Sequence, residues 1–241
     1  MKTLFRLLFF AIIILPLQPK AQSVIANVIK QNRTQLHYPL SVERFYRQED
    51  YRLVWVLKDT VKTPAWDAML LLDCVLQYGL NPVDYHPQEL TYELLHKVQA
   101  IKASNSDKAY FDVILTDAII TLINNLHYGQ FNPDFALGKV DADDITQFKG
   151  DKVLLDALEI NSLKSGIVNA QPKSEAYINL QRHLILLTTK YSGSNYVKPE
   201  SDIKKIAINM EWLRWINTTG KTMPLTCIVS EGIIIHYRHI R

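Results

Sequence analysis

The stretch AYFDVILTDAIITLINNLHYGQFNP, residues 109–133, decides the fold of this chain. Its apolar side chains recur every three or four residues, which is the spacing of one face of an α-helix. Ile120 and Ile123 widen that face, and Gly129 and Pro133 close the segment as helix stop signals do. The pattern predicts a central helix that is buried on most sides. Its main apolar face consists of Phe111, Leu115, Ala118, Ile119, Leu122 and Leu126.

Helical patterns continue on the N-terminal side of this segment. The residues SVERFYRQEDYRLVWV predict a helix with Ser41 as its N-cap, followed by a β-type run at RLVWV. The residues TPAWDAMLLLDCVLQYGL predict a second helix. We expect Thr63 as its N-cap, Pro64 at its first position and Gly79 as its C-cap.

On the C-terminal side, residues 151–168 predict one amphipathic helix and residues 170–193 predict another, with Pro172 near its start. Between these helices and the central one lies GKVDADDITQFKGD, which we expect to be an acidic surface loop. Its Asp141–Asp144 cluster lacks the ligand spacing, the glycine and the distal glutamate of a calcium-binding loop.

The residues IAINMEWLRWIN, 206–217, predict a helix with two apolar faces. One face carries Ile206, Met210 and Leu213, and the other carries Ile208, Trp212 and Trp215. A helix with two apolar faces needs a partner on each side. The earlier helices supply one partner, and the second is either another part of this domain or a domain that follows. A third alternative is that the tail of the chain folds back as a hairpin and covers the tryptophans. The candidate binding residues, at an interface between domains, are Met210, Trp212, Arg214 and Trp215.

The last part of the chain has a different pattern. The runs LTCIV and IIIHYRHI are β-type, and Ser230–Gly232 between them predicts a hairpin turn. The sequence therefore predicts a mainly α fold. It consists of a multi-helix domain over residues 22–217 and a short β-hairpin-like tail over residues 218–241.

The first 21 residues, MKTLFRLLFFAIIILPLQPKA, predict a cleaved signal peptide. Two basic residues, Lys2 and Arg6, precede an apolar run that is too short to span a bilayer comfortably. Export to the periplasm or cell envelope is the expectation, and an uncleaved anchor is the alternative. Removing this segment removes three of the 27 basic residues, which leaves as many basic residues as the 24 acidic ones. A net charge near zero argues against a nucleic-acid partner.

The sequence offers no recognisable catalytic site, and we expect no metal and no cofactor. Cys227 has no positioned base, and Cys74 has the setting of an inert core thiol, although the pairing of these two cysteines stays open. In a strand, His236 and His239 would point to opposite faces. The acidic residues of the helices look like surface charges. Four further histidines fall singly in different helices or turns: His86, His96, His127 and His183.

Five motifs in order across residues 45–216 resemble the large, multi-domain murein L,D-transpeptidases. They are FYRQEDYRLVWV, LLLDCVLQYGLNPVDYH, LTDAIITLINNLHYGQFNP, AYINLQRHLILL and KKIAINMEWLRWI. The resemblance implies the helical scaffold domain of that family. In the family, this domain precedes and supports a catalytic domain that cross-links peptidoglycan stem peptides through a cysteine.

The chain departs from the family pattern in several places. It contains no Ser-His-Gly-Cys motif, and YSGSNYVKPESD joins two helices where many relatives carry a peptidoglycan-binding module. Trp212 stands where the family has an arginine, and KTMPLTCIVSEG, residues 221–232, does not resemble the expected first strand of the catalytic domain. The resemblance therefore implies a scaffold that is inactive by itself, whether a truncated or frameshifted product or a stand-alone protein. Its expected partners are peptidoglycan or a cell-envelope protein. The alternative is a non-catalytic binding module that uses the Trp212 and Trp215 face.

Overall fold

The computed structural model describes residues 20–56, 64–142, 148–189 and 199–220. These residues are mainly helical and contain no β-strand, which confirms the predicted mainly α fold. Three short 3₁₀ helices accompany the α-helices: η1 (Val75–Tyr78), η2 (Pro82–Asp84) and η3 (Pro133–Phe135). The α-helices are α1 (Lys20–Gln31), α2 (Pro39–Gln48), α3 (Pro64–Asp73), α4 (Tyr92–Gln99), α5 (Asn105–Tyr128), α6 (Leu137–Ala142), α7 (Gly150–Glu159), α8 (Leu163–Asn169), α9 (Glu175–Thr189) and α10 (Glu200–Thr219).

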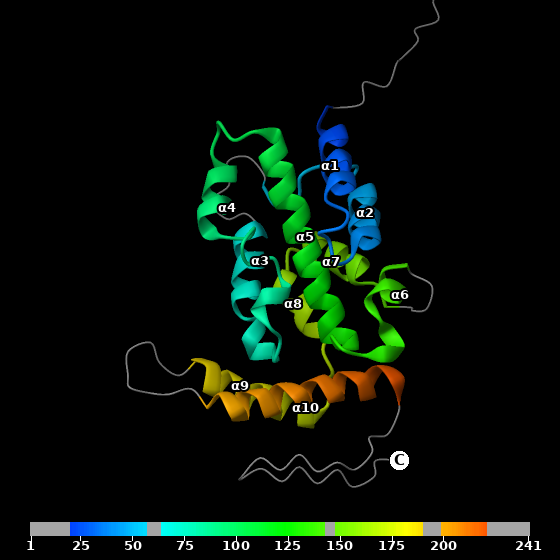
Figure 1. Cartoon of the computed structure of the whole chain (residues 1–241), viewed down its shortest axis with the longest axis vertical. Helices are drawn as coiled ribbons and strands as arrows, with labels where there is room; N and C mark the ends of the chain where they lie inside the picture. The colour runs from blue at the N-terminus through cyan, green and yellow to red at the C-terminus, as the bar shows by residue number, and fades with distance from the viewer. Residues whose placement is uncertain (1–19, 57–63, 143–147, 190–198, 221–241) are drawn as a thin grey trace, which may run out of the picture.

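Helix α5 is the centre of the bundle, as the sequence predicts. Helices α1, α2, α3, α4 and α7 all contact it (Figure 1). Among the described residues it is the one helix long and apolar enough to cross a membrane, and 94% of its apolar window is buried inside the protein. It is therefore the core helix of the bundle. The helix begins four residues earlier than its apolar pattern because Ser104 caps it, accepting a hydrogen bond from the backbone N–H of Asp107 at 3.0 Å.

Helices α9 and α10 form a second, smaller layer. They pack on each other and lie across one end of the bundle, at the bottom of Figure 1. Their shared apolar cluster contains the face that the sequence assigns to Ile206, Met210 and Leu213, and that face is buried. Helix α9 supplies the other side of the cluster, with Tyr177, Leu180 and Leu184.

Two expectations for the first half of the chain were wrong. Helix α2 begins at Pro39, so Ser41 lies inside the helix rather than at its N-cap. The run RLVWV is not a strand. Its backbone N–H groups at Val54, Trp55 and Val56 donate instead to the buried carboxylate of Asp112, at 2.8 to 3.0 Å. A side chain from α5 thus satisfies donors that a neighbouring strand would otherwise have to satisfy.

The prediction of an acidic surface loop after the central helix was also wrong for its first residues. Residues 137–142 form α6, and Asp141 is 4% exposed rather than solvated. Its carboxylate accepts hydrogen bonds from the backbone N–H groups of Leu40 and Ser41 at 3.0 and 2.8 Å. It therefore caps the first turn of α2, where unpaired N–H groups favour a negative charge. The predicted helix over residues 151–168 is two helices, α7 and α8, separated by Asn161 with φ of 50°.

Other boundaries agree only in part. The helix predicted up to Gly79 is α3 followed by the separate 3₁₀ helix η1, and α9 begins at Glu175, after Pro172. Pro64 is the first residue of α3, and Gly79 ends η1 in the left-handed conformation. The predicted N-cap Thr63, the signal peptide up to residue 19 and the hairpin at Ser230–Gly232 lie outside the described part of the chain.

Candidate docking groove along α10

The four candidate binding residues separate into two pairs. Met210 and Arg214 are fully buried, whereas Trp212 and Trp215 are partly exposed. The helix therefore has one buried face, turned toward α9 and the bundle, and one face that carries both tryptophans and is open as far as the described residues go. The alternative that the tail covers the tryptophans concerns residues 221–241, which lie outside the described part of the chain. The structure brings the tryptophans together and assigns the other two residues to the interior.

The open face of α10 lines a groove of about 280 Å³ between this helix, the loop after α5 and Gly79 at the end of η1. The predicted second face, Ile208, Trp212 and Trp215, is part of its wall. The indole rings of Trp212 and Trp215 lie 4.6 Å apart between centroids. The other lining residues are Gly79, Gln130, Phe131, Lys204, Ala207 and Glu211.

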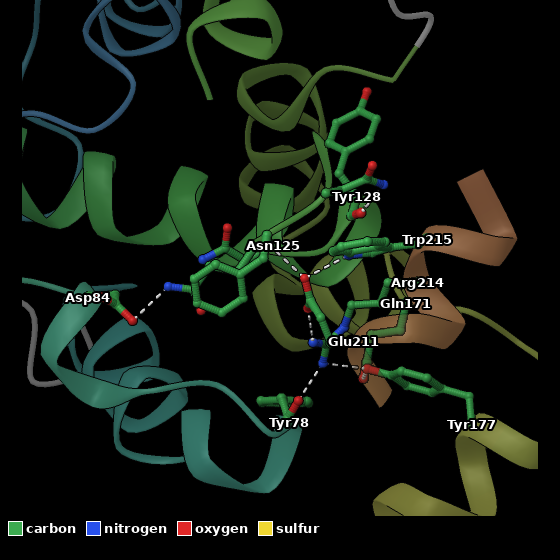
Figure 2. Close-up of polar contacts among 12 residues, drawn as sticks. Tyr78, Asp84, Asn125, Tyr128, Gln171, Tyr177, Glu211, Arg214 and Trp215 are labelled. Carbon is green, nitrogen blue, oxygen red and sulfur yellow. Dashed lines mark hydrogen bonds and ion pairs between the residues drawn. The ribbon is translucent and has the colours of Figure 1, made fainter. Parts of the chain in front are cut away.

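Glu211 fixes one wall of the groove. Its Oε1 accepts hydrogen bonds from the backbone N–H of Phe131 at 2.8 Å and from the indole Nε1 of Trp215 at 2.9 Å (Figure 2). Its Oε2 accepts a hydrogen bond from Arg214 at 3.1 Å. One carboxylate thus joins the loop after α5 to α10 and sets the orientation of the Trp215 ring.

Arg214 holds the same wall from inside. It is 0% exposed and donates hydrogen bonds to the carbonyl of Tyr78 and to the hydroxyl of Tyr177, the second at 2.9 Å (Figure 2). Burial by itself would lower the pKa of Arg214, but Tyr177 and Glu211 outweigh burial and raise that pKa above its usual range. The arginine is therefore a permanently charged clamp between η1, α9 and α10.

Two glycines let the backbone approach α10 closely. A Cβ atom on Gly129 would lie 2.6 Å from the Trp215 ring, and a Cβ on Gly79 would lie 3.0 Å from the Cα of Ala207. The sequence identifies both only as helix stops. Their second role, as places where α10 rests on the bundle, has no signal in a single sequence because it depends on residues more than 80 positions away.

The groove has the chemistry of a binding surface. Among its lining residues in the described part of the chain there is no Cys, Ser, Thr or His that could act as a nucleophile or base. Its walls are aromatic and aliphatic, with Lys204, Gln130 and Glu211 as the polar groups. Partly exposed tryptophans on a concave apolar surface are typical of residues that dominate binding energy.

The expectation that the histidines fall singly was wrong for His86. The structure brings His86 together with His37 and Asp117, on the bundle rather than at α10. The sequence could not show this cluster, because its members lie in a loop before α2, in the loop after η2 and in the middle of α5.

Comparison with known proteins places the bundle in a family. Residues 41–184 match the Scaffold domain family, which covers the chain from α2 to within α9. Helix α10 lies beyond the matched residues, whereas Gly79, Gln130 and Phe131 of the groove lie within them. No curated protein and no solved structure matches the chain. The match extends over more than half of the sequence, so the chain belongs to the Scaffold domain family.

Proposed function

We propose that this chain is a non-catalytic scaffold of the murein L,D-transpeptidase kind and that the groove along α10 is where it holds a catalytic domain. The observation that carries the proposal is the asymmetry of α10, which has one face sealed against α9 and the bundle and one face open with two tryptophans. Membership of the Scaffold domain family and the ordered L,D-transpeptidase-like motifs support it.

The groove suits a folded protein domain as its partner. Trp212, Ile208 and Phe131 offer contiguous apolar area, and Ile208 and Phe131 are 41% and 71% exposed. Burying such area removes it from water at a gain of about 25 cal/mol per Å². Trp215 is held by Glu211 before any partner arrives, so little side-chain entropy is lost on binding.

Export to the cell envelope is part of the proposal. The basic start and apolar run of residues 1–21 support it, and the buried Ile25 of α1 follows the expected cleavage point. Cleavage there would leave Ile25, Val28 and Ile29, the buried residues described in α1, in the mature protein. An alkaline phosphatase fusion after residue 40 tests this. We expect periplasmic phosphatase activity, and an inactive fusion retained in the cytoplasm would refute export.

A direct assay tests whether the chain is inactive alone. The purified full chain is incubated with disaccharide–tetrapeptide fragments of peptidoglycan, and cross-linked dimers are sought by mass spectrometry. We expect none, because the chain has no Ser-His-Gly-Cys motif. Cross-linking that a carbapenem inhibits would overturn the scaffold proposal.

A second candidate function is binding of peptidoglycan itself by the same aromatic surface, which the pairing of Trp212 with Trp215 favours. A pull-down on insoluble peptidoglycan compares the full chain with a Trp212→Ala/Trp215→Ala variant. The matched control is Trp66→Ala, which removes a tryptophan of α3 that stacks on Tyr92 outside the groove. Retention that only the double variant loses supports glycan binding, and equal retention of all three proteins excludes it.

A further inference from the structure

Three potential metal ligands from three distant segments meet on one side of the bundle. His37 precedes α2, His86 follows η2, and Asp117 lies in the middle of α5. One ligand atom from each residue lies within 4.8 Å of the other two. His86 Nε2 is 2.7 Å from Asp117 Oδ2, and His37 Nδ1 is 3.9 Å from the same oxygen.

We propose that His37, His86 and Asp117 form a binding site for a single Zn²⁺ ion. Two imidazole nitrogens and one carboxylate oxygen are ligands that Zn²⁺ prefers, and three protein ligands leave a fourth position for water. The rings of His37 and His86 both approach the carboxylate of Asp117, which brings the three ligand atoms together. The histidine rings are stacked, with centroids 4.9 Å apart and planes 22° from parallel.

The carboxylate is already positioned as metal ligands usually are, by hydrogen bonds from a second layer of groups. Asp117 accepts hydrogen bonds from the backbone N–H groups of His37 at 3.0 Å and Tyr38 at 2.9 Å. The first of these donors belongs to a proposed ligand, so His37 is tied to Asp117 by its backbone. His86 adopts a left-handed φ of 51°, a conformation in which histidine is enriched among non-glycine residues.

The charge around Asp117 also favours a cation. Its side chain is 0% exposed, and its ion pairs in the described part of the chain are with the two histidines, which carry charge only when protonated. The buried Asp151 differs, because Arg44 lies 2.9 Å from it and supplies a permanent charge. A divalent cation would give the Asp117 carboxylate the fixed counter-charge that Asp151 already has.

Metal binding requires the three ligand atoms, which now lie within 4.8 Å of one another, to adjust their separations. Zinc bond lengths place tetrahedral ligand atoms about 3.3 Å apart. The contact of His86 with Asp117 must therefore lengthen from 2.7 Å, and that of His37 with Asp117 must shorten from 3.9 Å. The ion replaces the proton between His86 Nε2 and Asp117, so the neutral His86 ring carries its proton on Nδ1. The ion enters beside His37, whose side chain is 36% exposed.

The test uses the untagged full chain after treatment with a chelator. Zn²⁺ binding is measured by titration calorimetry, and Co²⁺ binding is measured by its visible absorption, which reports tetrahedral coordination. The variants are His37→Gln and His86→Gln. The matched control is His96→Gln, which changes an exposed histidine of α4. Circular dichroism of each variant checks that the helices remain.

We expect one Zn²⁺ per chain and a tetrahedral Co²⁺ spectrum. Loss of a direct ligand should weaken binding by at least about 100-fold, which is the upper range for loss of a supporting group. The control should bind as the original chain does. The proposal is overturned if the chain gives no Co²⁺ spectrum, or if His37→Gln and His86→Gln bind Zn²⁺ as tightly as His96→Gln. In either case the three residues only link the two loops to α5 by hydrogen bonds.

Discussion

A Cβ atom on Gly129 would lie 2.6 Å from both Cδ1 and Nε1 of Trp215, so the indole ring of Trp215 packs directly on the backbone at the end of α5. The same glycine has φ of 87° and ψ of 150°, a backbone conformation that essentially only glycine adopts. This contact sets how α10 lies on the bundle and therefore the shape of the groove.

Replacing Gly129 by alanine should destabilise the protein. The new methyl group must displace the Trp215 ring or the Glu211 carboxylate, and the backbone conformation is strained as well. We expect the free energy of unfolding in urea to fall by about 2 kcal/mol or more. Gly138→Ala is the matched control, because a Cβ there would meet nothing within 4 Å and φ is not positive. Equal stability of the two variants would contradict the packing described here.

Arg214→Leu should cost about 3 kcal/mol of unfolding free energy. The change leaves the partly buried Glu211 without its charged partner and the carbonyl of Tyr78 without this donor. The control on the same helix is Lys205→Met. This lysine pairs with Asp202 at 3.6 Å on the surface, and surface pairs contribute at most about 1 kcal/mol. Urea denaturation of both variants measures the two losses of unfolding free energy. A loss for Arg214→Leu no greater than that for Lys205→Met would show that Arg214 does not hold η1, α9 and α10 together.

His127 should make the fold sensitive to mild acid. Burial lowers the pKa of His127 below its ordinary value of 6.5, more than its hydrogen bond to the carbonyl of Ala170 raises it. The ring is also stacked on Phe148 at 3.6 Å. The unfolded chain therefore binds a proton more readily than the folded one, so stability falls as the pH drops below about 6.5.

The variant His127→Gln removes this titration and keeps a side chain that can donate to Ala170. We expect it to lose less unfolding free energy between pH 7 and pH 5 than the original chain does. Denaturation in urea at both pH values measures the difference. An identical loss in the two proteins would mean that His127 does not carry the acid sensitivity.

The sequence predicts those parts of the structure that depend on local pattern. The periodicity of residues 109–133 identifies the core helix, and the spacing in residues 206–217 identifies two apolar faces of a helix, of which the structure buries the one with Ile206, Met210 and Leu213. The burial of two carboxylates, in contrast, cannot be predicted from local pattern. Asp112 and Asp141 look like surface charges in sequence, but they satisfy backbone N–H groups that are far away along the chain.

The groups of residues at the two candidate sites cannot be predicted from the sequence for the same reason. The contact of Gly129 with Trp215 and the meeting of His37 with His86 and Asp117 both depend on tertiary packing. A single sequence gives the residue types but not which of them meet. The two tryptophans were identifiable because helical spacing alone puts them on the same face.

The measurement that tests the scaffold proposal most directly is reconstitution in two parts. An L,D-transpeptidase catalytic domain, expressed without its own scaffold, is mixed with this chain and disaccharide–tetrapeptide, and cross-linked dimers are quantified by mass spectrometry. The groove variant is Ile208→Ala/Trp212→Ala, which spares the Trp215 contact with Gly129. The control is Leu186→Ala, which removes a 60% exposed side chain of α9 outside the groove. We expect the chain and the control to raise cross-linking above that of the catalytic domain alone and the groove variant to lose this effect. No stimulation by the chain, or equal stimulation by all three proteins, would contradict the role of the groove.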